Sequence, residues 1–262
     1  MPVAATLSVR LRTTRARRPD DAGEPFTLDL QFEAPPGITI LFGPSGCGKS
    51  TTLAAIAGLL RPDEGRVTLG DEVWFDSAAG IDRPVHQRGI AFVFQSLALF
   101  PHLTAVANVA YGMPRALSHA EKRRQAQELL ARLRVGHLAD RKPATFSGGE
   151  GQRVALARAF ATSPRLALFD EPFSAMDRQL RRDFVTDVRS FVSELGIPLV
   201  HVTHQRNEAR ALADRVVLVE AGRVRRTGTV RELLPVERGR DLSFDETPMP
   251  PRNPERNPEG QS

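Results

Sequence analysis

The stretch "GITILFGPSGCGKSTTLAAIAGLL", residues 37–60, joins an apolar run, a glycine-rich turn and an apolar-periodic segment. The run "GITILFG" is typical of a buried strand in a parallel sheet, and "KSTTLAAIAGLL" has the spacing of a helix. Between them "GPSGCGKST" matches the pattern G-x-x-x-x-G-K-[ST] in the strand-turn-helix context that the pattern requires. The stretch therefore predicts an α/β fold with an anion-binding loop, rather than a tight turn that happens to contain lysine.

The chemistry of this loop follows from its residue types. Glycines let the backbone curl so that successive N–H groups point at phosphate oxygens, and the helix N-terminus adds partial positive charge. Lys49 is expected to reach the β- and γ-phosphates of a nucleotide, and Ser50 to give its hydroxyl to Mg²⁺. The expected nucleotide-binding residues here are Gly43, Pro44, Ser45, Gly46, Cys47, Gly48, Lys49, Ser50 and Thr51.

A second glycine-rich turn stands at "TFSGGEGQRVALARA", residues 145–159, and contains no lysine. It too has the form of an anion cradle, with a helix expected to start at Gly151. The chain thus carries two cradles, only one of which supplies a lysine.

Polar residues follow three other predicted strands. "LALFDEP" places Asp170 and Glu171 at a strand tip, where Asp170 is expected to hold Mg²⁺ and Glu171 to polarise an attacking water. His204 ends "PLVHVTH" and is expected beside Asp170, within reach of a γ-phosphate, whereas His201 is taken as structural. Gln95 follows "IAFVF" and is expected to touch the Mg²⁺ shell or the water. A helix N-cap is the alternative role for the two carboxylates, and a polar strand end is the alternative for Gln95.

The order of elements favours an α/β fold with ligands beyond the carboxyl ends of parallel strands. Ser118 and Glu121 read as a helix N-cap and its capping-box partner. The segments expected as strands are 26–33, 37–43, 66–75 as a hairpin, 88–95, 165–172, 198–204 and 215–228 as a hairpin; the segments expected as helical are 49–60, 101–138 and 181–195.

Composition narrows the class of protein. The chain has 262 residues, a net charge of +5 and one cysteine, which excludes an intramolecular disulfide. Its arginines are scattered without interleaved aromatics, so no nucleic-acid partner is expected. It contains no apolar run of about 20 residues and no signal peptide, and a cytoplasmic location is expected. The proline-rich and charged segment 235–262 is expected to be a disordered tail.

Taken together, these motifs closely resemble the ABC-type ATPases. The resemblance covers residues 26–229 in order: phosphate loop, glutamine loop at Gln95, signature "FSGGE", "LALFDE", "SAMD" ending at Asp177, and His204. It implies a P-loop NTPase core of RecA-like type with a mainly parallel sheet, an antiparallel β subdomain, and an inserted helical subdomain at about 97–150 within a domain of residues 1–234. It also implies a homodimer with ATP and Mg²⁺, in which the signature caps the partner's ATP. The signature and aspartate-loop residues expected to bind it are Ser147, Gly148, Gly149, Glu150 and Asp177.

Departures from the family pattern are few. Phe146 stands where leucine is usual, Gly151 weakens the first helical turn, and Gln205 stands where an acidic residue is common. The residue that stacks on adenine is left open between Phe26 and arginines 12–18.

The segment after Gln95, "SLALFPHLTAVANVAYG", is similar to importer subunits, and among them to those for molybdate and related oxyanions. This implies two transmembrane permease subunits, a substrate-binding protein and a peripheral position on the inner face of the membrane. A C-terminal regulatory β-barrel, common in such subunits, is expected to be absent. The alternative is a soluble ABC ATPase that acts as an ATP-dependent clamp or regulator.

Overall fold

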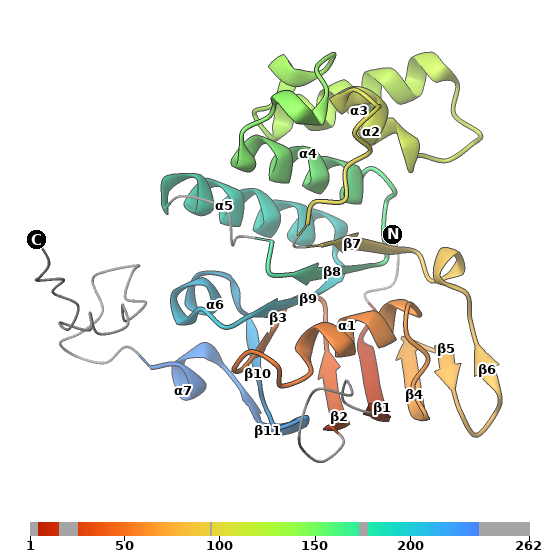
Figure 1. Ribbon diagram of the computed structural model, residues 1–262, viewed down its shortest axis with the longest axis vertical. Helices are drawn as coiled ribbons and strands as arrows, with labels where there is room; N and C mark the ends of the chain where they lie inside the picture. The colour runs from red at the N-terminus through yellow and green to blue at the C-terminus, as the bar shows by residue number, and fades with distance from the viewer. Residues whose placement is uncertain (1–4, 16–25, 95, 173–177, 236–262) are drawn as a thin grey trace, which may run out of the picture.

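A single sheet of eleven strands organises the chain, in the order β6-β5-β4-β1-β2-β11-β10-β3-β9-β8-β7. The computed structural model describes residues 5–15, 26–94, 96–172 and 178–235 (Figure 1). Gln95 and Asp177, two residues of the expected site, lie outside this described part, as does nearly all of the segment expected to be a tail.

One half of the sheet is parallel. Its strands are β3 (Gly37–Phe42), β7 (Ile90–Val93), β8 (Leu166–Asp170), β9 (Pro198–Thr203) and β10 (Arg215–Glu220), and β11 (Arg223–Gly228) forms a hairpin with β10. Phe42 pairs with Thr203, and Asp170 pairs with Val202, so the carboxyl ends of β3, β8 and β9 meet at one edge. This arrangement confirms the predicted α/β fold class.

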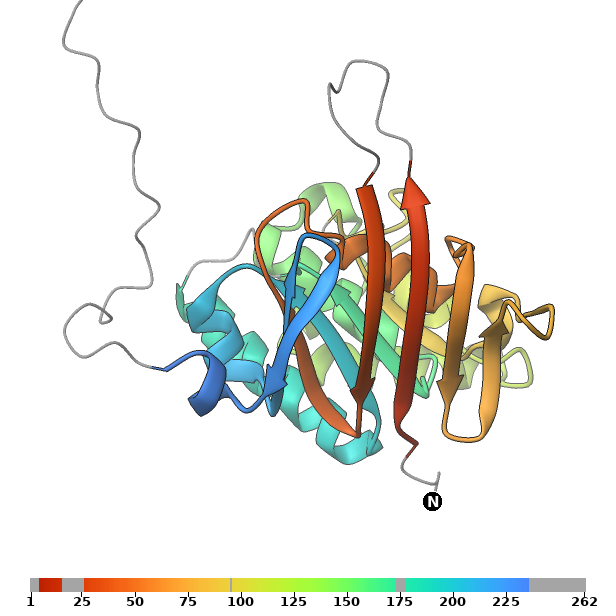
Figure 2. The same cartoon turned by 90° about the horizontal axis from the view of Figure 1, so that it is seen from below.

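The other half is antiparallel and runs in the order β6-β5-β4-β1-β2. Its strands are β1 (Leu7–Arg15), β2 (Phe26–Ala34), β4 (Glu64–Leu69), β5 (Glu72–Asp76) and β6 (Ile81–Asp82). In Figure 2, β1 and β2 lie side by side over their whole paired length, with β11 beyond β2. The prediction did not include β1, although its leucines and valine alternate with polar residues.

Helices cover both faces of the sheet. They are α1 (Lys49–Ala57), α2 (Ala105–Tyr111), α3 (His119–Arg132), α4 (Gly148–Phe160), α5 (Arg178–Leu195), α6 (Arg206–Leu212) and α7 (Val230–Leu233). Single 3₁₀ turns span Val85–Gln87 (η1), Gly136–Leu138 (η2) and Pro143–Thr145 (η3). Helices α2, α3 and α4 gather at the end of the molecule beyond β7 and β8 (Figure 1). Helix α4 runs past residue 150, the boundary expected for the helical subdomain.

Two apolar cores lie on opposite faces of the sheet. Ile40 points into the core shared with helices α2 to α6, and its neighbour Leu41 into the core beneath α1 and the antiparallel strands. Because β3 is buried on both faces, its sequence is a continuous apolar run rather than an alternating one. Across the described ranges, no helix combines the length and apolarity needed to span a bilayer.

Candidate active site

The loop between β3 and α1 is shaped by two close approaches of its glycines. A Cβ on Gly43 would lie 2.0 Å from the carbonyl oxygen of Val219 on β10. That oxygen belongs to the backbone of a strand, so it cannot move aside as a flexible side chain could. Gly48 has φ of +101°, and a Cβ there would lie 2.4 Å from the side chain of Leu28. Glycine is therefore required at both positions by space, and at Gly48 also by backbone conformation.

Lys49 is held inside this loop. Its side chain is 4% exposed, and Nζ donates hydrogen bonds of 2.8 Å to the carbonyl oxygens of both Gly43 and Pro44. Ser45 and Gly46, at the outer part of the same turn, are exposed, while Cys47 is buried. The ammonium group thus lies under a loop whose outer surface is open to solvent, which is the arrangement needed to bind an anion from outside.

Ser50 and Asp170 join α1 to the end of β8. Ser50 Oγ donates a hydrogen bond of 2.8 Å to Asp170 Oδ1. Burial raises the pKa of Asp170, nearby Glu171 raises it further, and the bond from Ser50 acts in the opposite direction. Among the described residues, no group of three or more histidine, cysteine or acidic side chains is arranged to hold a metal ion by itself. A hydroxyl and a carboxylate are nevertheless the hard oxygen donors that Mg²⁺ prefers when it keeps several waters.

Glu171 and His204 form a second pair at the same edge of the sheet. His204 Nδ1 lies 2.9 Å from Glu171 Oε1, and the Glu171 amide donates to the carbonyl of Val202 on β9. The sequence predicts His204 beside Asp170, and the hydrogen bond that the structure shows joins it to the next residue, Glu171. Glu171 has a positive φ of +47°, and its side chain reaches the residue that follows β9.

His201 also bonds to a glutamate, but it is buried whereas the His204 side chain is 47% exposed. His201 is fully buried on β9 and hydrogen-bonds through Nε2 to Glu208 of α6. The pair fixes α6 against the sheet, so the structural role assigned to His201 agrees with its surroundings.

The second cradle begins α4. The prediction that this helix starts at Gly151 is wrong: Ser147 is the N-cap and Gly148 the first helical residue. Ser147 and Glu150 form a capping box, which satisfies the free amide groups at the helix end and lets the helix start earlier. Gly151 is buried inside the first turns, where a Cβ would lie 2.8 Å from Leu97.

His137 contacts Glu150 of this cradle, and the sequence does not predict this contact. His137 belongs to η2, and its Nε2 lies 2.9 Å from Oε1 of Glu150 in the first turn of α4. A histidine in "VGHL" gives no local sign of such a partner, because the two residues come together only when η2 packs beside α4.

The two cradles are separate within one chain. Within the described ranges, the hydrogen bonds of Lys49 and Ser50 stay at the β3–α1 loop and the end of β8. Those of the Ser147 and Glu150 side chains stay at the start of α4 and at His137 of η2. Phe26 packs against the first cradle, since a Cβ on Gly48 would be 3.3 Å from its ring.

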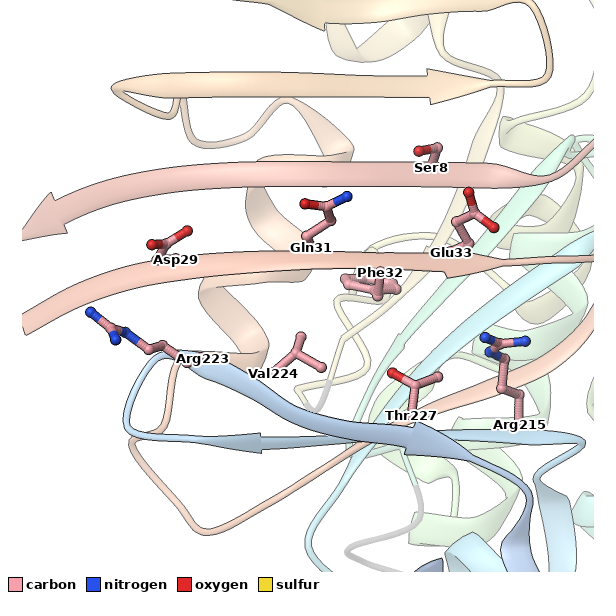
Figure 3. Close-up of a pocket in the computed structure, with 9 residues that line it drawn as sticks. All are labelled: Ser8, Asp29, Gln31, Phe32, Glu33, Arg215, Arg223, Val224 and Thr227. Atoms are coloured by element: carbon pink, nitrogen blue, oxygen red, sulfur yellow. The ribbon is translucent and has the colours of Figure 1, made fainter.

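A cleft of about 640 Å³ lies elsewhere, where β2 and β11 diverge beyond their single paired position (Figure 3). Asp29 and Arg223 stand at one end and Glu33 and Arg215 at the other (Figure 3). Its described lining comes from β1, β2, β10 and β11 and includes none of the expected site residues.

Comparison with known proteins agrees with this geometry. Residues 28–174 match the ABC transporter family. The chain is 44% identical over 222 residues to the molybdenum import ATP-binding protein ModC 1 of Azotobacter vinelandii, covering 84% of this chain and 61% of that protein. It is 45% identical to ModC of Albidiferax ferrireducens, covering 80% of this chain and 57% of that protein. The chain thus spans less than two thirds of the length of these relatives.

Among solved structures, the chain is similar to the dimeric post-hydrolysis state of the ATP-binding cassette MJ0796 bound to ADP and Pi. The identity is 30% and the TM-score 0.71, over 86% of this chain and 99% of that cassette. With the fold, the loop at Gly43–Thr51 and the matched family region in agreement, the chain belongs to the ABC transporter family.

Proposed function

We propose that the chain is the ATP-binding and ATP-hydrolysing subunit of an ABC importer, and that two copies close around two ATP molecules. The observation that carries this proposal is the presence of two separate anion cradles, only one of which contains a lysine. A single chain does not need both for one nucleotide. A head-to-tail dimer uses both, since each ATP then lies between one chain's Lys49 and the other chain's Ser147.

ATP binding is supported by the loop geometry. Lys49 Nζ already lies beneath the loop and can exchange its bonds to the Gly43 and Pro44 carbonyls for bonds to phosphate oxygens. The start of α1 adds its own N–H groups and dipole. Phe26, half-buried against Gly48, is the candidate for stacking on the adenine base.

A magnesium ion fits the donor set at the end of β8. Ser50 and Asp170 would hold it, with Gln95 as the expected further ligand. When bound, Mg²⁺ neutralises charge that develops on the phosphates during phosphoryl transfer. Burial raises the pKa of Asp170, and the positive charge of Mg²⁺ would act in the opposite direction.

Hydrolysis is assigned to Glu171 and His204. Glu171 lies at the sheet edge next to Asp170 and would take the proton of the attacking water. His204 lies within hydrogen-bond distance of Glu171 through Nδ1, and in its protonated form it would also have an Nε2–H to donate to the γ-phosphate. Asp177 is proposed to act across the dimer interface, and loss of the γ-phosphate would release that interface.

Importer function requires a surface for the permease. A groove of about 490 Å³ lies between α2 and α3 and is lined by Leu103, Val106, Tyr111 and Lys122, among others. Tyr111 is 67% exposed, unusually open for a large aromatic side chain. We assign this groove to the permease subunits, which places the protein on the inner face of the membrane, with a substrate-binding protein on the other side.

Molybdate is the proposed cargo, on the strength of the ModC relatives. The test is the molybdenum content of cells that lack this gene and grow in limiting molybdate. A loss that the wild-type gene restores, and that Lys49→Ala does not, supports the assignment. Unchanged molybdenum content in the deleted strain would refute it.

The dimer is tested by light scattering on the Glu171→Gln protein with and without ATP and Mg²⁺. We expect the mass to double with ATP, and the doubling to disappear when Ser147→Ala is added. Ser118→Ala removes an equivalent N-cap from α3 and should leave the dimer intact. A mass that stays monomeric although ATP is bound would contradict the proposal for the isolated subunit.

The alternative is a soluble ABC ATPase that acts as a clamp or regulator. Such a protein would also form the ATP dimer but would bind no permease. Co-purification of membrane subunits with the tagged chain separates the two functions.

A further inference from the structure

The start of α4 gives its hydrogen-bond donors to one carboxylate. Ser147 donates to Glu150 Oε2 twice, from its backbone N–H and from its hydroxyl, each at 2.8 Å. The other oxygen, Oε1, lies 2.9 Å from His137 Nε2. The side chain of Glu150 therefore occupies the donors of Ser147 from within the chain.

This carboxylate is strongly ionised. The backbone N–H of Ser147 is the main cause, followed by His137 and the Ser147 hydroxyl, and together they lower the pKa of Glu150 to about 2. Glu150 thus carries its negative charge throughout the neutral range, at the positive end of a helix.

We propose that Glu150 competes, as an internal anion, with the γ-phosphate of the partner's ATP for the donors of Ser147, and that His137 is the positioning residue that holds Glu150 and limits this competition. The inference rests on the proposed function, because it concerns the same ATP-bridged dimer. Each donated proton serves one acceptor at a time, so the phosphate must displace the carboxylate from Ser147 before it can bind there.

A helix cap alone would produce part of this geometry. Helices α3 and α7 begin with the same capping box, through Ser118 with Glu121 and Thr229 with Glu232. Within the described ranges, only the box of α4 has a histidine bonded to its glutamate. Only this box also belongs to a glycine-rich cradle. The cap explains the stability of the helix start, whereas the competition predicts an effect on the affinity of the dimer.

Glu150→Gln separates the two roles. The amide oxygen of glutamine still accepts from the Ser147 backbone, so the cap remains. The negative charge, however, is gone, and the phosphate no longer meets a like charge. We expect the dissociation constant of the ATP dimer to fall by about tenfold at low salt, and the gain to shrink at high salt. Glu121→Gln makes the same change in the box of α3 and should leave the dimer unchanged.

His137→Ala gives a second, independent signal. In the chain that keeps Glu150, His137→Ala removes the partner of Oε1, so the carboxylate competes more strongly for Ser147. We therefore expect a weaker dimer. In the chain with Glu150→Gln it should have no effect, so the two changes are coupled in a double-mutant cycle. ATP binding by the monomer should be equal in all these proteins, because it depends on the chain's own phosphate loop.

The experiment is sedimentation equilibrium of these variants in the Glu171→Gln background, with ATP and Mg²⁺, at 50 and about 300 mM salt. A tighter dimer for Glu150→Gln, coupled to His137 and reduced by salt, supports the proposal. A dimer in the parent protein that Glu150→Gln leaves unchanged or weakens overturns this proposal alone. Absence of an ATP dimer in every variant overturns the proposed function along with it.

Discussion

Glu171 places its carboxylate through a backbone conformation that few non-glycine residues adopt, with φ of +47°. Strain of this kind is found at functional sites, where the surrounding structure maintains it. Here the Glu171 amide bonds to Val202 and the side chain to His204. The sequence "LALFDEP" predicted the residue but could not predict its backbone angle or its partner.

Glu171→Gln should reduce the rate of ATP hydrolysis by at least about 100-fold, because it removes the proposed proton acceptor. ATP binding should remain, since the amide keeps the shape of the side chain. Phosphate release measures the rate of hydrolysis, and the rise in melting temperature on adding ATP measures binding. Glu194→Gln, on α5 and bonded to Arg132, is the control and should hydrolyse ATP normally. Equal rates for the two variants would exclude Glu171 as the base.

Asp170 carries a stability cost that depends on pH. The pKa of Asp170 is raised in the folded state, so folding favours its protonated form. The free energy of unfolding that this contributes is fully present below the ordinary carboxyl pKa. It is lost as the pH rises through the raised pKa. Above the ordinary carboxyl pKa, Asp170 therefore destabilises the nucleotide-free protein. Asp170→Asn should raise the melting temperature at pH 7 by a few degrees, and the gain should shrink as the pH is lowered toward 4.

Calorimetry without Mg²⁺ or ATP measures this difference. With Mg²⁺ and ATP present, wild type should melt at a higher temperature than Asp170→Asn, because bound Mg²⁺–ATP stabilises only the wild-type protein. A variant that melts below wild type at pH 7 without ligand would contradict the prediction.

At the scale of elements, two local sequence patterns indicate structure that the predicted elements do not include. "SGGE" is a capping box like "SHAE", yet its glycines suggested a loop, and the helix was predicted to begin at Gly151 rather than Gly148. The alternation in "LSVRLRTT" is that of a half-buried strand, but no strand was predicted there, because the segment is rich in arginine. The contact between α4 and η2 could not be predicted, because the two elements meet only in the folded chain.

Helix α1 owes its position partly to Arg88, a buried guanidinium 1% exposed. It donates to the carbonyls of Ala55 and Ile56 at the end of α1, and pairs with Asp82. Burial lowers the pKa of Arg88, which shows that desolvation opposes its charge. Arg88→Met should lower the free energy of unfolding by about 3 kcal/mol, since it leaves the helix carbonyls and the carboxylate without this donor.

Urea denaturation measures this loss. Arg61→Met is the matched control: Arg61 pairs with the same Asp82 at 3.8 Å, but its side chain is 71% exposed. An exposed pair contributes at most about 1 kcal/mol. Similar small losses for both variants would mean that α1 does not depend on Arg88.

At the scale of the whole molecule, the three regions to which we assign different tasks lie on different elements. The phosphate loop lies at the edge formed by β3, β8 and β9, the second cradle at the start of α4, and the apolar groove between α2 and α3. Motif order predicted where the first two lie in the sequence, although the start of α4 was predicted at Gly151 rather than Gly148. The segment after Gln95 is the one that resembles importer subunits, and its residues Leu103, Val106 and Tyr111 line the groove. The second wall, formed by α3, could not be predicted, because no local pattern describes how the two helices pack.

Tyr111→Glu tests the groove as the permease surface. Tyr111 is exposed and packs on Phe100, with ring centroids 4.5 Å apart, so a carboxylate there should disrupt an apolar contact with the permease and leave the distant ATP site unchanged. We expect at least tenfold less co-purified permease and a similar loss of uptake, with normal ATP hydrolysis by the isolated subunit. Leu59→Glu is the control, because Leu59 is 55% exposed just after α1 and outside the groove. If Tyr111→Glu and Leu59→Glu retain equal amounts of permease, the groove is not the docking surface; if neither they nor wild type retain any, the soluble clamp becomes the better assignment.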